Sequence, residues 1–226
     1  TYYYLPDTKN GNKLQKNIIF NGFIELRKVW FKIKELQSLK RYLGAFFVYS
    51  MAVQTVMIIA AYFGEKEVAW GSDANRTSGL ILSILLIQLI AVFGAWATSK
   101  ASAAFGNIKV LMVINFLWII ICVYAYFVIT PNDFYIAAAS VGLVMGGIQS
   151  LSRSTYSKLI PENTVDTTSF FSFYDVAEKI GIVIGMFLYG YITDITGKAQ
   201  NAILFLILFF VVGFFLLGRI SNKKVN

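Results

Sequence analysis

The chain has 226 residues, of which 57% are hydrophobic and only 14% are charged, and its formal net charge is +8. A soluble domain usually carries about 25% charged residues, so this composition excludes an ordinary soluble globular protein. The chain has no histidine and a single cysteine. It therefore lacks the commonest general base and metal ligand, and it cannot form an internal disulfide.

Residues 1–41 precede the first long apolar run. The turn-rich stretch YLPDTKNGNK predicts a linker, and IIFNGFIELRKVWFKIKEL follows it. Apolar side chains recur there at helical spacing, with lysines and arginines on the other faces. The pattern predicts an amphipathic helix in the cytoplasmic membrane interface, and a partner-binding helix is the alternative. The apolar face consists of Ile19, Phe23, Leu26, Trp30 and Ile33.

Six apolar runs follow, and each approaches the roughly 20 residues that a helix needs to cross hydrocarbon. Because lipid offers no partners to unpaired backbone groups, each run is predicted to be a transmembrane helix. We expect one all-α membrane bundle over residues 42–220 and a cytoplasmic tail at 221–226. The runs cover residues 43–63, 79–98, 110–129, 134–152, 170–193 and 201–218.

Lysine and arginine are concentrated in the lead, in the second and fourth loops and in the tail, whereas the other loops carry few. By the positive-inside rule, both ends are therefore expected on the cytoplasmic side, and six crossings require the same. The chain begins at Thr1 and not at Met, so we expect it to continue a longer protein. The bilayer accounts for the basic charge, so no nucleic-acid partner is expected.

The six spans repeat a pattern of polarity. The first, second, fourth and fifth contain polar side chains, whereas the third and sixth are almost wholly apolar, and the sixth is expected to be peripheral and to face lipid. Two such triplets run in opposite directions, which predicts two inverted three-helix repeats. Gly142 and Gly146 in the fourth span, and Gly181 and Gly185 in the fifth, have the spacing of helix-packing residues.

The start of the fifth span carries Asp175, Glu178 and Lys179, and Arg153 closes the fourth span. One interpretation is structural: acids favour a helix start, and Asp175 can pair with Lys179 one turn away. Our hypothesis is that Arg153 pairs with Asp175 or Glu178 to close the cytoplasmic end of a central cavity. Direct binding of substrate or of a proton is the alternative role. We expect the helix to be capped by one of the residues 167–169.

Uncharged polar side chains lie nearer the middle of the spans, namely Tyr49, Gln54, Gln88 and Gln149. Amides and hydroxyls suit a polar or zwitterionic solute that is held by hydrogen bonds, so these four are candidate cavity residues. Each of them is equally consistent with a hydrogen bond between helices.

Three segments of the spans are distinctive: FFVYSMAVQTVMIIAAYFG, GLVMGGIQSLSRSTYSKLIPE and FFSFYDVAEKIGIVIGMFLYGYITDITG. They resemble the bacterial branch of the vacuole-effluxer-like family of major facilitator superfamily permeases. The resemblance implies that residues 1–41 are the central cytoplasmic loop and that the six spans are the C-terminal half of a twelve-helix protein. It also implies that an N-terminal six-helix half is the main partner.

The sequence therefore predicts half of a secondary active transporter that moves a small polar solute, with amino acids as one candidate class, by alternating access. Its expected location is a bacterial cytoplasmic membrane, and its expected partners are lipid, the solute and the other half. A non-transporting scaffold or sensor is the alternative. A membrane enzyme is disfavoured because no catalytic constellation is visible, and no cofactor or metal is expected.

Overall fold

The computed structural model describes residues 18–162, 164 and 166–220, and in these ranges it consists of helices and short connections without strands. An amphipathic helix precedes six longer or more apolar ones. The helices are α1 Ile18–Glu35, α2 Gln37–Glu67, α3 Asp73–Phe105, α4 Asn107–Tyr126, α5 Pro131–Leu159, α6 Thr167–Thr196 and α7 Ala199–Gly218.

Helices α2 to α7 are long and apolar enough to cross a membrane. Each of the six predicted runs coincides with one of them, and only the third run extends past its helix, which ends at Tyr126. The helices begin and end at local signals. Thr130 and Asp133 form a capping box ahead of α5, and Gly197 follows α6 in a left-handed conformation. The all-α membrane fold class is confirmed.

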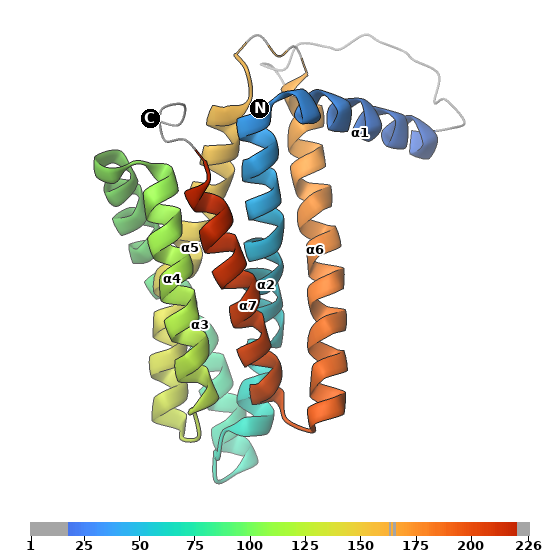
Figure 1. The fold of residues 1–226 in the computed structure, drawn as a ribbon. Helices are drawn as coiled ribbons and strands as arrows, with labels where there is room; N and C mark the ends of the chain where they lie inside the picture. Colours follow the sequence, from blue (N-terminus) through green and yellow to red (C-terminus); the bar gives the residue numbers. More distant parts are fainter. Residues whose placement is uncertain (1–17, 163, 165, 221–226) are drawn as a thin grey trace, which may run out of the picture.

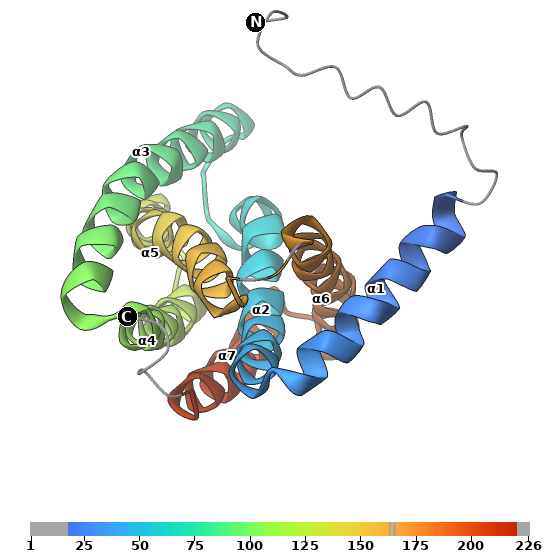
Figure 2. The ribbon, with the colours of Figure 1, turned by 90° about the horizontal axis from the view of Figure 1, so that it is seen from above.

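Helices that occupy equivalent positions in the two triplets make equivalent contacts. If α2, α3 and α4 correspond to α5, α6 and α7, the pair α3–α5 corresponds to α6–α2, and both pairs pack extensively. The pair α4–α7 maps onto itself and also packs extensively. Seen along the bundle, α2 and α5 lie inside, and α3 and α6 lie toward the outside (Figure 2). This is the arrangement of two inverted three-helix repeats.

The start of α2, the junction between α5 and α6 and the end of α7 all lie at the same end of the bundle as α1 (Figure 1). We call this the α1 end. Helix α1 runs across it at a steep angle to the other helices and packs against α6 and α2. Of its predicted apolar face, Ile33 is fully buried and Trp30 stacks on Phe173 of α6 with ring centroids 5.7 Å apart, whereas Phe23 remains exposed.

Within this half alone, burial does not follow apolarity, and the lipid-facing position of the sixth span stays a prediction. Helices α3 and α6 bury the smallest shares of their most apolar windows, 11% and 22%, whereas α7 buries 33% and α4 buries 44%. Helix α7 does expose one face, at Leu208, Val212 and Phe215, but its other face packs against α2 and α4. Apolarity does not set burial within the bundle, because helix packing depends on which side of a helix carries each residue, and composition does not record that.

Three of the four predicted packing glycines lie where a neighbouring helix leaves no room for a Cβ, whereas Gly181 is in ordinary contact with Met51. An added Cβ on Gly142 would lie 2.7 Å from the carbonyl oxygen of Ile87, and one on Gly146 would meet the carbonyl of Ala91, both on α3. On α6, a Cβ on Gly185 would meet the Thr55 hydroxyl of α2. The two glycine pairs therefore lie at the two equivalent contacts, α5 on α3 and α6 on α2.

We expect Gly146→Ala to destabilise the bundle by about 1–3 kcal/mol, because the methyl group would press on backbone that cannot move aside. Thermal unfolding of the full-length protein in detergent measures the effect. The control is Gly190→Ala on α6, where nothing lies within 4 Å of the added Cβ. That variant should be neutral or gain up to about 1 kcal/mol of helix propensity. Equal unfolding temperatures for both variants would contradict the close-packing role.

Candidate functional site

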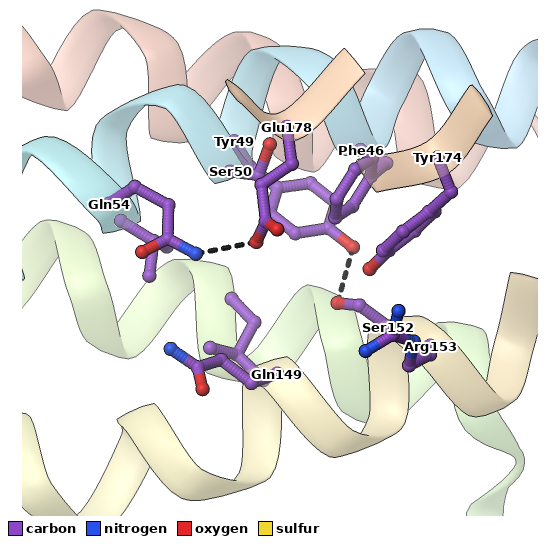
Figure 3. A pocket seen from close by; sticks show the side chains of 11 residues that line it. Phe46, Tyr49, Ser50, Gln54, Gln149, Ser152, Arg153, Tyr174 and Glu178 are labelled. Atoms are coloured by element: carbon purple, nitrogen blue, oxygen red, sulfur yellow. Dashed lines mark hydrogen bonds between the residues drawn. The ribbon is translucent and has the colours of Figure 1, made fainter. Parts of the chain in front are cut away.

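A partly open pocket of about 210 Å³ lies between α2, α5 and α6 on the α1-end side of the bundle. Its walls carry hydroxyl, amide, carboxylate and guanidinium groups (Figure 3). Its lining residues are Phe46, Tyr49, Ser50, Val53, Gln54, Ile148, Gln149, Ser152, Arg153, Tyr174 and Glu178.

The wall between α2 and α5 is held by a buried hydroxyl network. The Tyr49 and Ser152 hydroxyl oxygens lie 2.7 Å apart, and Tyr42 donates to the Ser152 carbonyl oxygen at 2.7 Å. The two tyrosine hydroxyls are 3.3 Å from each other. Hydrogen bonds between buried hydroxyls make this wall rigid, because breaking one of them leaves a buried polar group without a partner. Tyr49 therefore lines the pocket and also joins two helices.

The opposite wall brings a carboxylate and an amide together. Gln54 Nε2 of α2 donates to Glu178 Oε1 of α6 at 2.5 Å, and both side chains line the pocket (Figure 3). Glu178 is only partly exposed, and its position in α6 lies more than three turns from the helix start, beyond the reach of the helix dipole. A charge-assisted hydrogen bond from Gln54 is therefore its main stabilising contact in the described structure.

Arg153 pairs with Asp175, the first of the two alternative partners. Arg153 Nη2 lies 2.7 Å from Asp175 Oδ1, which joins α5 to α6 near the α1 end. The guanidinium also lies 5.8 Å and 5.9 Å from the ring centroids of Phe171 and Tyr174. About half of each charged side chain is exposed, at 56% and 48%, so water still screens this pair in the isolated bundle.

Of the three remaining candidate residues, one lines the pocket and two do not. Gln149 lines the pocket, whereas Gln88 is exposed on α3 and is not among the lining residues. Lys179 is exposed on α6 and makes no ion pair with Asp175, which contacts Arg153 instead. The proposed local Asp175–Lys179 pair is therefore not formed.

The expected cap of α6 is also wrong. Asp166 is the N-cap residue: it accepts hydrogen bonds from the Ser169 amide at 3.2 Å and from the Ser169 hydroxyl at 2.6 Å. These bonds favour the charged carboxylate and hold the pKa of Asp166 below its ordinary value. Asp166 caps better than the hydroxyl residues that follow it, because a carboxylate also complements the positive end of the helix.

Sequence reasoning missed the aromatic part of the pocket. Phe46 and Tyr174 stack face to face with ring centroids 4.0 Å apart, and both line the cavity. Helical spacing could have indicated Tyr174, because it lies four residues before Glu178 on the same face of α6. Ile148 and Val53 carried no such signal, since apolar residues are frequent on every face of these helices.

The pocket offers complementary charges to a small solute. Arg153 can attract an anionic group, Glu178 can attract a cationic one, and Gln54 and Gln149 can donate or accept hydrogen bonds between them. No group of three or more possible metal ligands occurs among the described residues. The arrangement suits reversible binding by hydrogen bonds and charge.

Six membrane-spanning helices in two inverted triplets, with a polar pocket between α2, α5 and α6, define one half of a major facilitator fold. The family model of the Atg22-like vacuole effluxers matches residues 1–226, and the chain belongs to that family.

Three relatives show how far the likeness extends. The chain is 32% identical over 212 residues to the MFS-type transporter YxiO of Bacillus subtilis, covering 93% of this chain and 47% of that protein. It is 26% identical over 227 residues to autophagy-related protein 22-1 of Phaeosphaeria nodorum, covering 92% and 39%. It is 24% identical over 220 residues to autophagy-related protein 22 of Saccharomyces cerevisiae, covering 92% and 40%. The chain thus spans less than half the length of these relatives. No solved structure matches it significantly.

Proposed function

We propose that the chain forms the C-terminal half of a secondary active transporter that moves a small zwitterionic solute, with amino acids as the first class to test. The observation that carries this proposal is the pocket between α2, α5 and α6, in which a guanidinium and a carboxylate face the same space. The name of the family model, vacuole effluxer, and the name of the Bacillus relative, MFS-type transporter, support transport as the activity.

The exposed faces of α3 and α6 support a second six-helix half as the partner. Leu89, Val92 and Phe93 on α3, and Val183 and Phe187 on α6, are each at least 59% exposed. These are the two least buried helices, and in the view along the bundle they lie on opposite sides of α2 and α5 (Figure 2). A second six-helix half that covers both faces would complete the cavity. The relatives are about twice as long as this chain or longer, which leaves room for such a half.

The Arg153–Asp175 pair supports a gate at the α1 end, which we assign to the cytoplasmic side on the distribution of basic residues. It joins α5 to α6 beside the pocket, so separating the two helices requires breaking it. Alternating access needs contacts that close one end and open again when the halves rock. Gln54 and Glu178 lie deeper along α2 and α6 and are assigned to solute binding.

The test is solute exchange by the full-length protein in proteoliposomes, with labelled neutral amino acids supplied outside and unlabelled ones inside. We expect counterflow uptake that empty liposomes lack, and we expect excess unlabelled solute to inhibit it. A protein that exchanges none of the tested amino acids, and whose unfolding temperature none of them raises, would contradict this assignment. A scaffold or sensor that binds a solute would show the shift in unfolding temperature without exchange.

A further inference from the structure

A second cavity, an apolar groove of about 420 Å³, lies on the outside of the bundle where α1, α2 and α6 meet. Trp30 of α1 and Phe173 of α6 form one wall, and Leu43 and Phe47 of α2 form the other. Lys40 is the single charged residue among its lining residues. The groove shares no lining residue with the polar pocket, so it is a separate site.

Gly44 keeps the groove open. It lines the groove on α2, and nothing lies within 4 Å of the position that a Cβ would take there. The glycines at the helix contacts are different, because an added Cβ on them would meet a neighbouring helix. A glycine in the middle of a helix costs about 1 kcal/mol relative to alanine, and at Gly44 no close packing compensates for that cost. The space beside Gly44 is therefore available to another molecule.

Two cations border the groove at the α1 end. Lys40 lines it, and Lys34 Nζ lies 5.4 Å from the ring centroid of Trp30. Neither lysine forms an ion pair with another described residue. An apolar trough with a cationic rim is complementary to an amphiphile with an anionic head.

We propose that this groove binds one anionic glycerophospholipid, with an acyl chain along Gly44 and the phosphate at Lys40 and Lys34. An extended peptide segment fits less well, because its backbone needs hydrogen-bond partners that the almost wholly apolar lining does not offer. An acyl chain needs none, and it buries apolar surface along the whole groove. A phosphate beside lysines at the membrane surface adds electrostatic attraction.

The bound lipid would contact the helix that carries the proposed gate. Phe173 lines the groove, and the next two residues are Tyr174 in the polar pocket and Asp175 in the ion pair. Phe173 also stacks on Trp30, so α1, the lipid and α6 would form one packed unit. Binding itself does not depend on transport, and the test below measures binding alone.

Native mass spectrometry of the full-length protein in detergent, titrated with phosphatidylglycerol or phosphatidylcholine, tests the site. We expect the first phosphatidylglycerol to bind about tenfold more tightly than phosphatidylcholine, and we expect Gly44→Leu to weaken it about tenfold by filling the trough. The control is Gly190→Leu, which also adds a side chain into open space on α6 but lies outside the groove. Unchanged lipid binding by Gly44→Leu would overturn the proposal.

A separate variant tests the contact between the lipid head group and the two lysines. Replacing Lys34 and Lys40 together with glutamine should remove the preference for phosphatidylglycerol and leave phosphatidylcholine binding as it is. Equal binding of both lipids to the unmodified protein would refute an anionic head.

Fluorescence quenching gives a second measurement of lipid binding, and it does not require the Gly44→Leu variant to fold. Phosphatidylglycerol brominated on its acyl chain should quench a component of the tryptophan fluorescence that Trp30→Phe lacks. Identical quenching of both proteins would place the lipid elsewhere.

Discussion

Reversing the charge of Arg153 should reduce transport by about tenfold or more, and reversing Asp175 in the same protein should restore most of it. The two groups are 2.7 Å apart, so Arg153→Asp replaces an attraction between α5 and α6 with a repulsion. Two unit charges about 4 Å apart interact by about 4 kcal/mol near a protein surface. Because both side chains are about half exposed, we discount this to about 1.4 kcal/mol, which is a factor of about ten. Counterflow rates in proteoliposomes measure the effect.

The matched control uses the carboxylate that Arg153 does not contact. Arg153→Asp combined with Glu178→Arg should not recover, because Glu178 bonds to Gln54 and not to Arg153, and because this change also removes a proposed binding residue. Arg153→Asp combined with Asp175→Arg recreates the pair in reverse and should recover. If both double variants recover equally, or neither recovers, the ion pair is not the gate contact. Equal unfolding temperatures across the set would show that the losses arise from transport and not from folding.

Gln54→Leu should reduce transport roughly ten- to hundredfold, since a hydrogen bond to a charged group contributes about 1.5–3 kcal/mol and its loss leaves Glu178 without this donor. Glu178→Leu removes the other partner and should cost a similar amount. If the two act as one unit, the double variant should cost no more than the worse single variant. Counterflow rates for the four proteins of this cycle measure the coupling.

Gln88 provides the control for the Gln54–Glu178 double-mutant cycle. It has the same side chain as Gln54, but it is exposed on α3 and outside the pocket. Gln88→Leu should therefore change the transport rate by no more than about twofold, because it removes no hydrogen bond that the structure contains. A loss as large as that of Gln54→Leu, or additive losses in the Gln54–Glu178 cycle, would contradict the assignment of these two residues to one binding unit.

Most of the fold could be predicted because it depends on local rules. An apolar run of about 20 residues has no stable option in lipid except a helix, so α2 to α7 follow from hydropathy alone. Thr130 and Asp133 mark the start of α5 by a capping box that is visible in sequence. The cap of α6 was misassigned because several residues near Ser169 can accept a hydrogen bond, and the backbone angle that selects Asp166 is not readable from residue type.

The candidate site could be predicted only in part. The polar and charged residues of the fourth and fifth spans identified Arg153, Asp175 and Glu178, because ionisable groups are rare in membrane helices. Their pairing could not be derived. Asp175 and Glu178 lie within one turn of each other, so a small rotation of α6 decides which of them faces Arg153 and which faces Gln54.

Six membrane-spanning helices, their repeat, and the residues that can carry charge or allow close packing follow from the amino-acid sequence, because each depends on run length, spacing and residue type. The packing of the helices determines that Gln54 lines a pocket while Gln88 does not, and that Gly44 borders an open groove while Gly146 meets a helix. Both differences have the same cause. A residue type fixes what a side chain can do, whereas the rotation and approach of whole helices fix what it meets.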